Sequence, residues 1–285
     1  MFQTIGPHIK LLNVPKNGNA PYCNCTLIDD QVRVLIDAGC GPELAAQIQP
    51  QGLDVLILTH FHYDHVSSSQ KLGASQIWCH ELEKGANESL EVFQQTYGFH
   101  QFGGEKLGEL LIETHKLEPK PIARGLADGE ILDFGKVRLK VIHTPGHTAG
   151  HISFFEEETG ILISGDINPW YGCLCCDLTD YLDSIDKCLE LHPKLVINGH
   201  NGIMDEDLEA NFLAYRDRIL RREEKLLQSL AVPQTFASLA AQHLIVRTSL
   251  SQFQEFFNKQ GVHNHLKRLI KMDRVRKDDD FYFRV

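Results

Sequence analysis

Three histidines and an aspartate lie close together in the segment His60-Phe-His62-Tyr-Asp64-His65. Neutral imidazole nitrogens and carboxylate oxygens together favour zinc, iron or manganese over calcium or magnesium. Along an extended segment His60 and His62 point to the same side, and a turn after them would direct Asp64 and His65 to another side. The segment therefore predicts ligands for two metal ions. A chance histidine cluster is disfavoured because the segment directly follows a predicted buried strand.

Three further side chains follow predicted strands in the same way. His147 lies in a Pro-Gly turn, Asp166 follows Ser164-Gly165, and His200 follows Asn198-Gly199. Each of them alone is more typical of a turn or an exposed loop. Because the same arrangement recurs, all three are candidate metal ligands.

Short apolar strands must position these side chains. The unbroken apolar segment 54–59 predicts a buried strand that ends at the histidine cluster, and segments 137–143, 159–164 and 194–198 predict the strands before the other candidates. Segments 25–27 and 32–36 predict a strand pair that turns at Asp29-Asp30, and 42–48 predicts a helix with proline in its first turn. Open α/β-type sheets place their chemistry at the carboxyl ends of such strands.

These residues, in this order, resemble the motifs of the metallo-β-lactamase superfamily. The resemblance spans about the first 230 residues. It implies an α+β fold, a four-layer αββα sandwich with the site at one edge of its two sheets. It also implies two ligand sets, with His60, His62 and His147 on one metal, Asp64, His65 and His200 on the other, and Asp166 bridging them. Asp37 falls where the family keeps an aspartate that supports the loop, and His151 is a further candidate for orienting a ligand imidazole.

The resemblance implies a metal-dependent hydrolase. Two divalent ions, with zinc favoured over manganese and iron, would use a bridging hydroxide to attack an ester, thioester or similar small substrate. Asp64 is expected to be a ligand first and a catalytic proton carrier second. A mono-iron enzyme similar to persulfide dioxygenases is an alternative, because it uses one metal and a related histidine set.

The predicted domains are a catalytic domain over 1–230, with a helical cap inserted at about 82–127, and a small unit over 233–285. A long helix is predicted over 205–230, and Pro233 ends it. Helices over 236–243, 250–259 and 262–272, with a hairpin that turns at Asp278-Asp279-Asp280, predict a winged-helix-like unit. In this the chain is similar to a lactamase-B-like subgroup, some of whose members cut single-stranded RNA.

RNA is therefore the alternative partner to a small-molecule substrate. Residues 262–285 carry a net positive charge, and the long helix contains Arg216, Arg218, Arg221 and Arg222. A formal charge of -10 over the whole chain opposes this reading. The winged-helix-like unit could instead serve packing or a homodimer.

Composition and cysteine content indicate a globular protein of a reducing compartment. The chain is 42% hydrophobic and 23% charged, and no apolar segment is long enough for a bilayer span or a signal peptide, so we expect a cytoplasmic protein without membrane association. The eight cysteines are expected as free thiols. Three of them, Cys173, Cys175 and Cys176, share the loop after Asp166 with Trp170 and Tyr171, which would line a substrate pocket or pack beside it.

Overall fold

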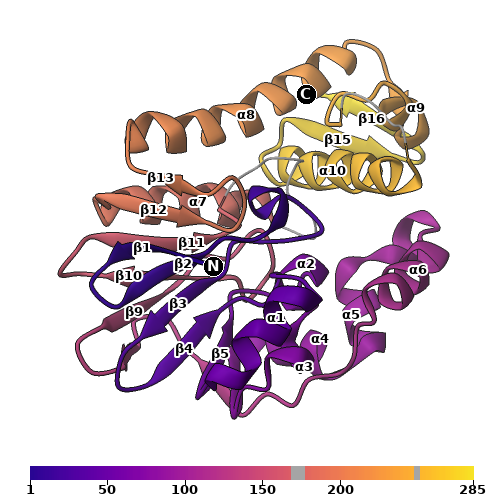
Figure 1. The fold of residues 1–285 in the computed structure, drawn as a ribbon. Helices are drawn as coiled ribbons and strands as arrows, with labels where there is room; N and C mark the ends of the chain where they lie inside the picture. Colours follow the sequence, from indigo (N-terminus) through magenta and orange to yellow (C-terminus); the bar gives the residue numbers. More distant parts are fainter. Residues whose placement is uncertain (168–176, 247–250) are drawn as a thin grey trace.

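A computed structural model describes residues 1–167, 177–246 and 251–285. It contains two large sheets and one small one (Figure 1). The first sheet has seven strands in sequence order: β1 (Phe2–Gly6), β2 (Ile9–Leu12), β3 (Thr26–Asp29), β4 (Arg33–Ile36), β5 (Val55–Leu58), β6 (Gln76–His80) and β7 (Arg124–Leu126). The second has six, in the order β13 (Ile203–Met204), β12 (Leu195–Asn198), β11 (Ile161–Gly165), β10 (Ile152–Glu156), β9 (Arg138–His143) and β8 (Ile131–Asp133). The small sheet has the order β14 (Gln234–Thr235), β16 (Phe281–Arg284) and β15 (Val275–Asp278).

Helices cover the outer faces of the two large sheets. Those on the side of the first sheet are α1 (Pro42–Ile48), α2 (Tyr63–Val66), α3 (Ser69–Leu72), α4 (Lys84–Glu88), α5 (Leu90–Tyr97) and α6 (Glu105–His115). Those on the side of the second are α7 (Leu178–Glu190) and α8 (Leu208–Ser229). The C-terminal segment adds α9 (Phe236–Ala241) and α10 (Gln252–Lys271). Short 3-10 helices are η1 (Pro15–Gly18), η2 (Gln49–Gln51), η3 (Glu81–Glu83) and η4 (Phe99–Phe102).

Strand β5 shows how the layers are held together. It pairs in parallel with β4 and β6, and all four of its residues are buried. Successive side chains of a strand point to opposite faces. Accordingly, Leu56 and Leu58 lie in the apolar core under the helices, whereas Val55 and Ile57 lie in the core between the two sheets. A third core joins the second sheet to α7 and α8. The expected αββα sandwich is confirmed.

The predicted cap segment contains three of the six α-helices beside the first sheet. Residues 84–115 form α4, α5 and α6, and β7 then adds the edge strand of the sheet at 124–126. The ring of Tyr97 in α5 lies 4.7 Å from that of His62, so this segment closes over the histidine cluster. Assignment of 82–127 as a cap and of 1–230 as one domain stays a prediction.

The C-terminal segment packs against the end of α8 and against the helices beside the first sheet. Leu226 and Leu230 of the α8 end share a core with Leu266 of α10. On the other side of α10, the ring of Phe256 lies 5.0 Å from that of Phe99. The hairpin β15–β16 turns at the predicted aspartates. The winged-helix assignment stays a prediction.

The expected break between two helices near residue 260 is wrong. Residues 252–271 form the single helix α10, so this part of the described chain has two helices after Pro233 where three were expected. Gly261 lies inside α10, and a Cβ there would come within 2.6 Å of Ile245. The glycine permits this close contact and does not end the helix.

No helix in the described ranges is long and apolar enough to span a membrane. The five described cysteines are free and buried, as expected.

Candidate metal centre

The histidine cluster begins at the carboxyl end of β5. His60 is fully buried and is followed by Phe61 and His62 in extended conformation; α2 then begins at Tyr63. The turn of helix redirects the chain, so Asp64 and His65 approach from a different side. This change of direction is the one that the sequence predicted.

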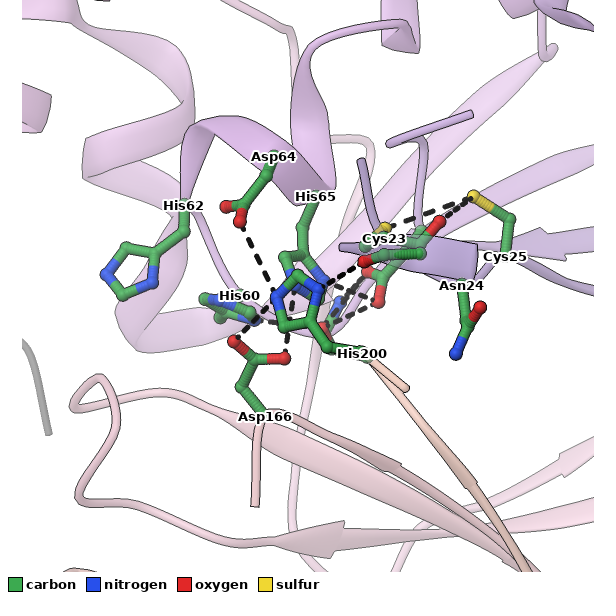
Figure 2. Close-up of polar contacts among 12 residues, drawn as sticks. Cys23, Asn24, Cys25, His60, His62, Asp64, His65, Asp166 and His200 are labelled. Atoms are coloured by element: carbon green, nitrogen blue, oxygen red, sulfur yellow. Dashed lines mark hydrogen bonds and ion pairs between the residues drawn. The ribbon is translucent and has the colours of Figure 1, made fainter. Parts of the chain in front are cut away.

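The other three candidates follow strands of the second sheet and reach the same place, as Figure 2 shows for Asp166 and His200. Asp166 follows β11, and its two oxygens lie 3.2 Å from His65 Nε2, 3.4 Å from His147 Nε2 and 3.3 Å from His200 Nε2. His200 Nε2 also lies 3.5 Å from Asp64 Oδ2. Asp166 thus contacts residues of both expected ligand sets, the position that a bridging carboxylate requires.

Donor atoms of these residues form compact groups. Within each group the candidate ligand atoms lie within 4.8 Å of one another. The four groups are His60 with His62 and His147, Asp64 with His65 and His200, His60 with His65 and Asp166, and Cys23 with Asp37 and His65. The first two are the sets implied by the family resemblance. Their role as ligands stays a prediction.

Several atoms that the ligands would turn toward a metal are left without a hydrogen bond. His60 Nε2, His65 Nε2 and Asp166 Oδ1 are buried and have no hydrogen-bond partner among the described residues. Such orphaned buried atoms are rare and require an explanation. Divalent cations held by the two expected ligand sets would give each of these atoms a partner, so the donor set fits a metal site.

The opposite ring nitrogens are fixed by protein atoms. His65 Nδ1 donates to Asp37 Oδ2 at 2.9 Å, His200 Nδ1 donates to Gly18 O at 2.5 Å, and His60 Nδ1 lies 3.0 Å from Thr59 Oγ1. Metal-binding histidines in proteins are typically held in this way, which sets the tautomer and the ring orientation. Asp37 also accepts hydrogen bonds from Thr59 N and Oγ1.

His151 holds a ligand and is not placed to be one. Its Nε2 accepts a hydrogen bond from Asp166 N at 2.9 Å, and its Nδ1 donates to Thr144 O at 3.1 Å. Both nitrogens are therefore occupied. Asp37 contacts a candidate ligand imidazole, whereas His151, expected to orient a ligand imidazole, contacts the backbone of Asp166; the supporting role of both residues stays a prediction. His143 stacks on His80, away from the ligand sets.

Two glycines allow the loops to approach this closely. A Cβ at Gly199 would lie 2.3 Å from Asp166 Oδ1, and Gly146, before His147, has a φ of 120° that side chains rarely tolerate. Trp170, Tyr171 and the cysteines 173, 175 and 176 lie outside the described residues.

Burial and charge divide the histidines into two classes. Burial lowers the pKa of His60 and His62 well below its usual range and that of His147 to about 4, so these rings are neutral and ready to bind a metal. Burial also opposes charge on His65 and His200. The negative charge of Asp166 outweighs the effect of burial at both rings, together with Asp37 at His65 and Asp64 at His200. The pKa of His200 therefore rises to about 9, and that of His65 rises well above its usual range.

This division predicts two metal sites with different pH dependence. A cation must displace protons from His65 and His200, so affinity at their site should rise with pH up to about 9, by up to about ten-fold per pH unit and proton. The neutral set of His60, His62 and His147 should show little change over about pH 6.5 to 9. Zinc titration by calorimetry in buffers of different ionisation enthalpy measures both effects. Equal pH dependence of the two sites would contradict the division.

Glu83 joins the two metal-binding loops, and sequence reasoning did not find it. Its Oε2 accepts a hydrogen bond from Phe61 N at 2.9 Å, and its Oε1 accepts from Thr148 Oγ1 at 2.7 Å and from Gly150 N at 2.8 Å. The side chain is buried, and burial raises the pKa of its carboxyl to about 7. One carboxylate therefore fixes the loop of His60 and His62 to the loop of His147.

Comparisons with known proteins agree with this geometry. The metallo-beta-lactamase superfamily model matches residues 18–200. A beta-lactamase-like protein 2 homolog of Drosophila melanogaster is 26% identical over 269 residues, covering 88% of this chain and 84% of that protein. A hydroxyacylglutathione hydrolase of Haemophilus influenzae is 33% identical over 153 residues, covering 50% of this chain and 66% of that protein. The crystal structure of a metallo-beta-lactamase family protein from Thermus thermophilus superposes with a TM-score of 0.76 at 25% identity, covering 99% of this chain and all of that one. The chain belongs to the metallo-beta-lactamase superfamily.

Proposed function

We propose that the chain is a binuclear metal-dependent hydrolase of a small thioester or ester. The observation that carries the proposal is the convergence of His60, His62, His147, Asp64, His65 and His200 around Asp166, with orphaned donor atoms on their inner side. A similar protein is named as a hydrolase of hydroxyacylglutathione, which is a thioester. Zinc is our proposed metal because imidazole and carboxylate donors suit it.

The residues of the chain divide the work of such a site. When bound, divalent ions would supply a water-derived nucleophile at neutral pH and polarise the carbonyl oxygen of the substrate. Phe61 and Tyr97 pack on His62 and exclude bulk water from that side. Asp64 is buried, and burial raises the pKa of its carboxyl. Asp64 is therefore our candidate for holding a proton beside the reacting atoms.

Single-stranded RNA is the second candidate substrate, and the burial of one α8 arginine argues against it. Arg216 pairs with Asp186 at 2.9 Å, Arg221 pairs with Asp217 at 3.7 Å, and Arg222 is buried. Burial keeps Arg222 from phosphate, and the ion pairs of Arg216 and Arg221 compete with phosphate only weakly because they are exposed. Basic side chains of the β15–β16 hairpin still favour RNA, because Arg276 and Lys277 are exposed and phosphate can reach them.

Metal removal and reloading test the proposal. We expect chelator-treated protein to release no thiol from S-lactoylglutathione or a short acyl thioester. Two equivalents of zinc or manganese per chain should restore the activity. A labelled single-stranded RNA is the control substrate and should stay intact. One iron per chain with oxygen-dependent turnover, or cleavage of the RNA but of no thioester, would contradict the proposal.

A further inference from the structure

A cavity lies beside the candidate metal centre. Its volume is about 440 Å³, within the usual range for pockets that bind small molecules. Its walls come from the segment before α1, from the α2–α3 turn and from the chain after α6. The polar residues of its lining include Tyr22, Ser67, Lys71, His115, Lys116 and Lys120.

The cavity adjoins the metal-binding loop. Ser67 in its wall follows His65 by two residues, and the ring of His115 lies 4.6 Å from that of Tyr63, which stands between His62 and Asp64. The cavity and the metal centre are therefore on neighbouring sides of α2. A ligand bound in the cavity lies close to the metal-binding loop.

The cavity walls carry a net positive charge, opposite in sign to the charge of the chain as a whole. Lys71, Lys116 and Lys120 face a single acidic lining residue, Glu118, although the whole chain has a formal charge of -10. None of the three lysines forms an ion pair with a described residue. Tyr22 and Ser67 add hydroxyl groups that can donate hydrogen bonds.

Lys120 is the most informative of these residues. Only 5% of it is exposed, and its Nζ donates to the backbone oxygen of Glu118 at 3.0 Å. Burial lowers the pKa of its ammonium group to about 8. A buried ammonium is costly unless an anion pairs with it. A bound anion would supply the missing partner.

We propose that this cavity binds the anionic part of the carrier in an acyl thioester, a phosphate or a carboxylate. The inference rests on the proposed function for the identity of the substrate, but the lysines and the cavity are independent of it. With the carrier held here, the acyl carbon would be placed toward the metal-binding loop. The shared chemistry fits both a coenzyme A thioester, through its phosphates, and a glutathione thioester, through its carboxylates.

Binding measurements test the anion site in the cavity, and turnover measurements test its effect on thioester hydrolysis. Calorimetry with S-methyl-coenzyme A and S-methylglutathione, which cannot be hydrolysed, measures binding to the metal-loaded full chain. We expect the chain to bind at least one of these two compounds. The double variant Lys71→Gln/Lys116→Gln and the single variant Lys120→Gln should each weaken that binding about ten-fold or more, because charge-assisted contacts are lost. The ratio of kcat/KM for the anionic thioester to that for a neutral S-alkyl thioacetate should fall by a similar factor. Lys225→Gln, an exposed lysine of α8, is the matched control and should bind as the wild type does.

The two proposals fail in different ways. If the wild-type chain binds a methylated carrier through the lysines but hydrolyses no thioester, the cavity assignment holds and the proposed function fails. If it hydrolyses the neutral thioester but binds neither carrier, or if both lysine variants bind like the Lys225→Gln control, the cavity assignment is overturned. The double variant changes only exposed side chains, so it keeps the test valid should Lys120→Gln not fold.

Discussion

We expect His62→Ala to lose metal-dependent thioester hydrolysis by more than about 100-fold, because removing even a group that only supports a metal ligand costs roughly 10- to 100-fold. His62 Nδ1 lies 2.8 Å from His147 Nε2, and both rings are neutral through burial. The substitution removes one of the three nitrogen donors of that set, so the variant should retain one tightly bound ion per chain. Metal content after gel filtration and the rate of thiol release measure the two effects.

The fold of this variant should persist. His62 is buried, but its Nε2 has no hydrogen-bond partner among the described residues, so the lost packing is offset in part by removal of a costly buried nitrogen. Thermal unfolding of the metal-free proteins measures this. His100→Ala, at an exposed position of η4, is the matched control and should keep full activity. A His62→Ala variant with wild-type kcat/KM and two bound ions would refute the ligand assignment.

Local patterns were enough to predict the metal loop and its strand. The apolar segment before His60 is continuous because both faces of β5 are buried, one under helices and one between the sheets. The extended residues followed by a helical turn then separate His62 from Asp64. These features depend on neighbours in sequence, which is why spacing alone revealed them.

Contacts between segments that are far apart in the sequence could not be predicted from local patterns. Glu83 is 22 residues from Phe61 and 67 residues from Gly150, and the oxygen of Gly18 that holds His200 is 182 residues from it. A glutamate after a strand is usually exposed, and no local period distinguishes this one. The continuation of α10 through Gly261 could not be predicted for the same reason, since Ile245, which packs against this glycine, is on another segment.

The ligands are therefore predictable from sequence in a way that their supports are not. A metal demands particular donor atoms, which restricts the residue type at each ligand position. A support needs only one polar atom at the right place, and backbone oxygens, hydroxyls and carboxylates all serve, as Gly18, Thr59 and Asp37 show. Variants of the supports consequently test the three-dimensional arrangement, and Glu83 is the most connected of them.

Glu83→Ala should weaken metal binding about 10- to 100-fold and lower kcat, although Glu83 contacts no metal ligand side chain. The substitution leaves Phe61 N, Gly150 N and the Thr148 hydroxyl buried without an acceptor, at about 1–3 kcal/mol for each group that water cannot reach. The loops of His62 and His147 would then lose the one described side chain that accepts backbone hydrogen bonds from both, and the direct His62–His147 contact of 2.8 Å would hold them less rigidly. Zinc affinity by competition with a chromogenic chelator and kcat on a thioester are the measurements.

Two comparison variants separate positioning from general destabilisation. Glu83→Gln keeps one oxygen but turns an amide NH₂ toward a backbone or hydroxyl donor, so it should restore only part of the affinity. Glu81→Ala, in the same 3-10 helix but with 68% of its side chain exposed, should leave zinc affinity unchanged. If Glu83→Ala lowered the melting temperature yet bound zinc as tightly as Glu81→Ala does, Glu83 would stabilise the fold without positioning the metal loops. Loss of affinity below the melting transition, partly regained in Glu83→Gln, is the result that the hydrogen bonds predict.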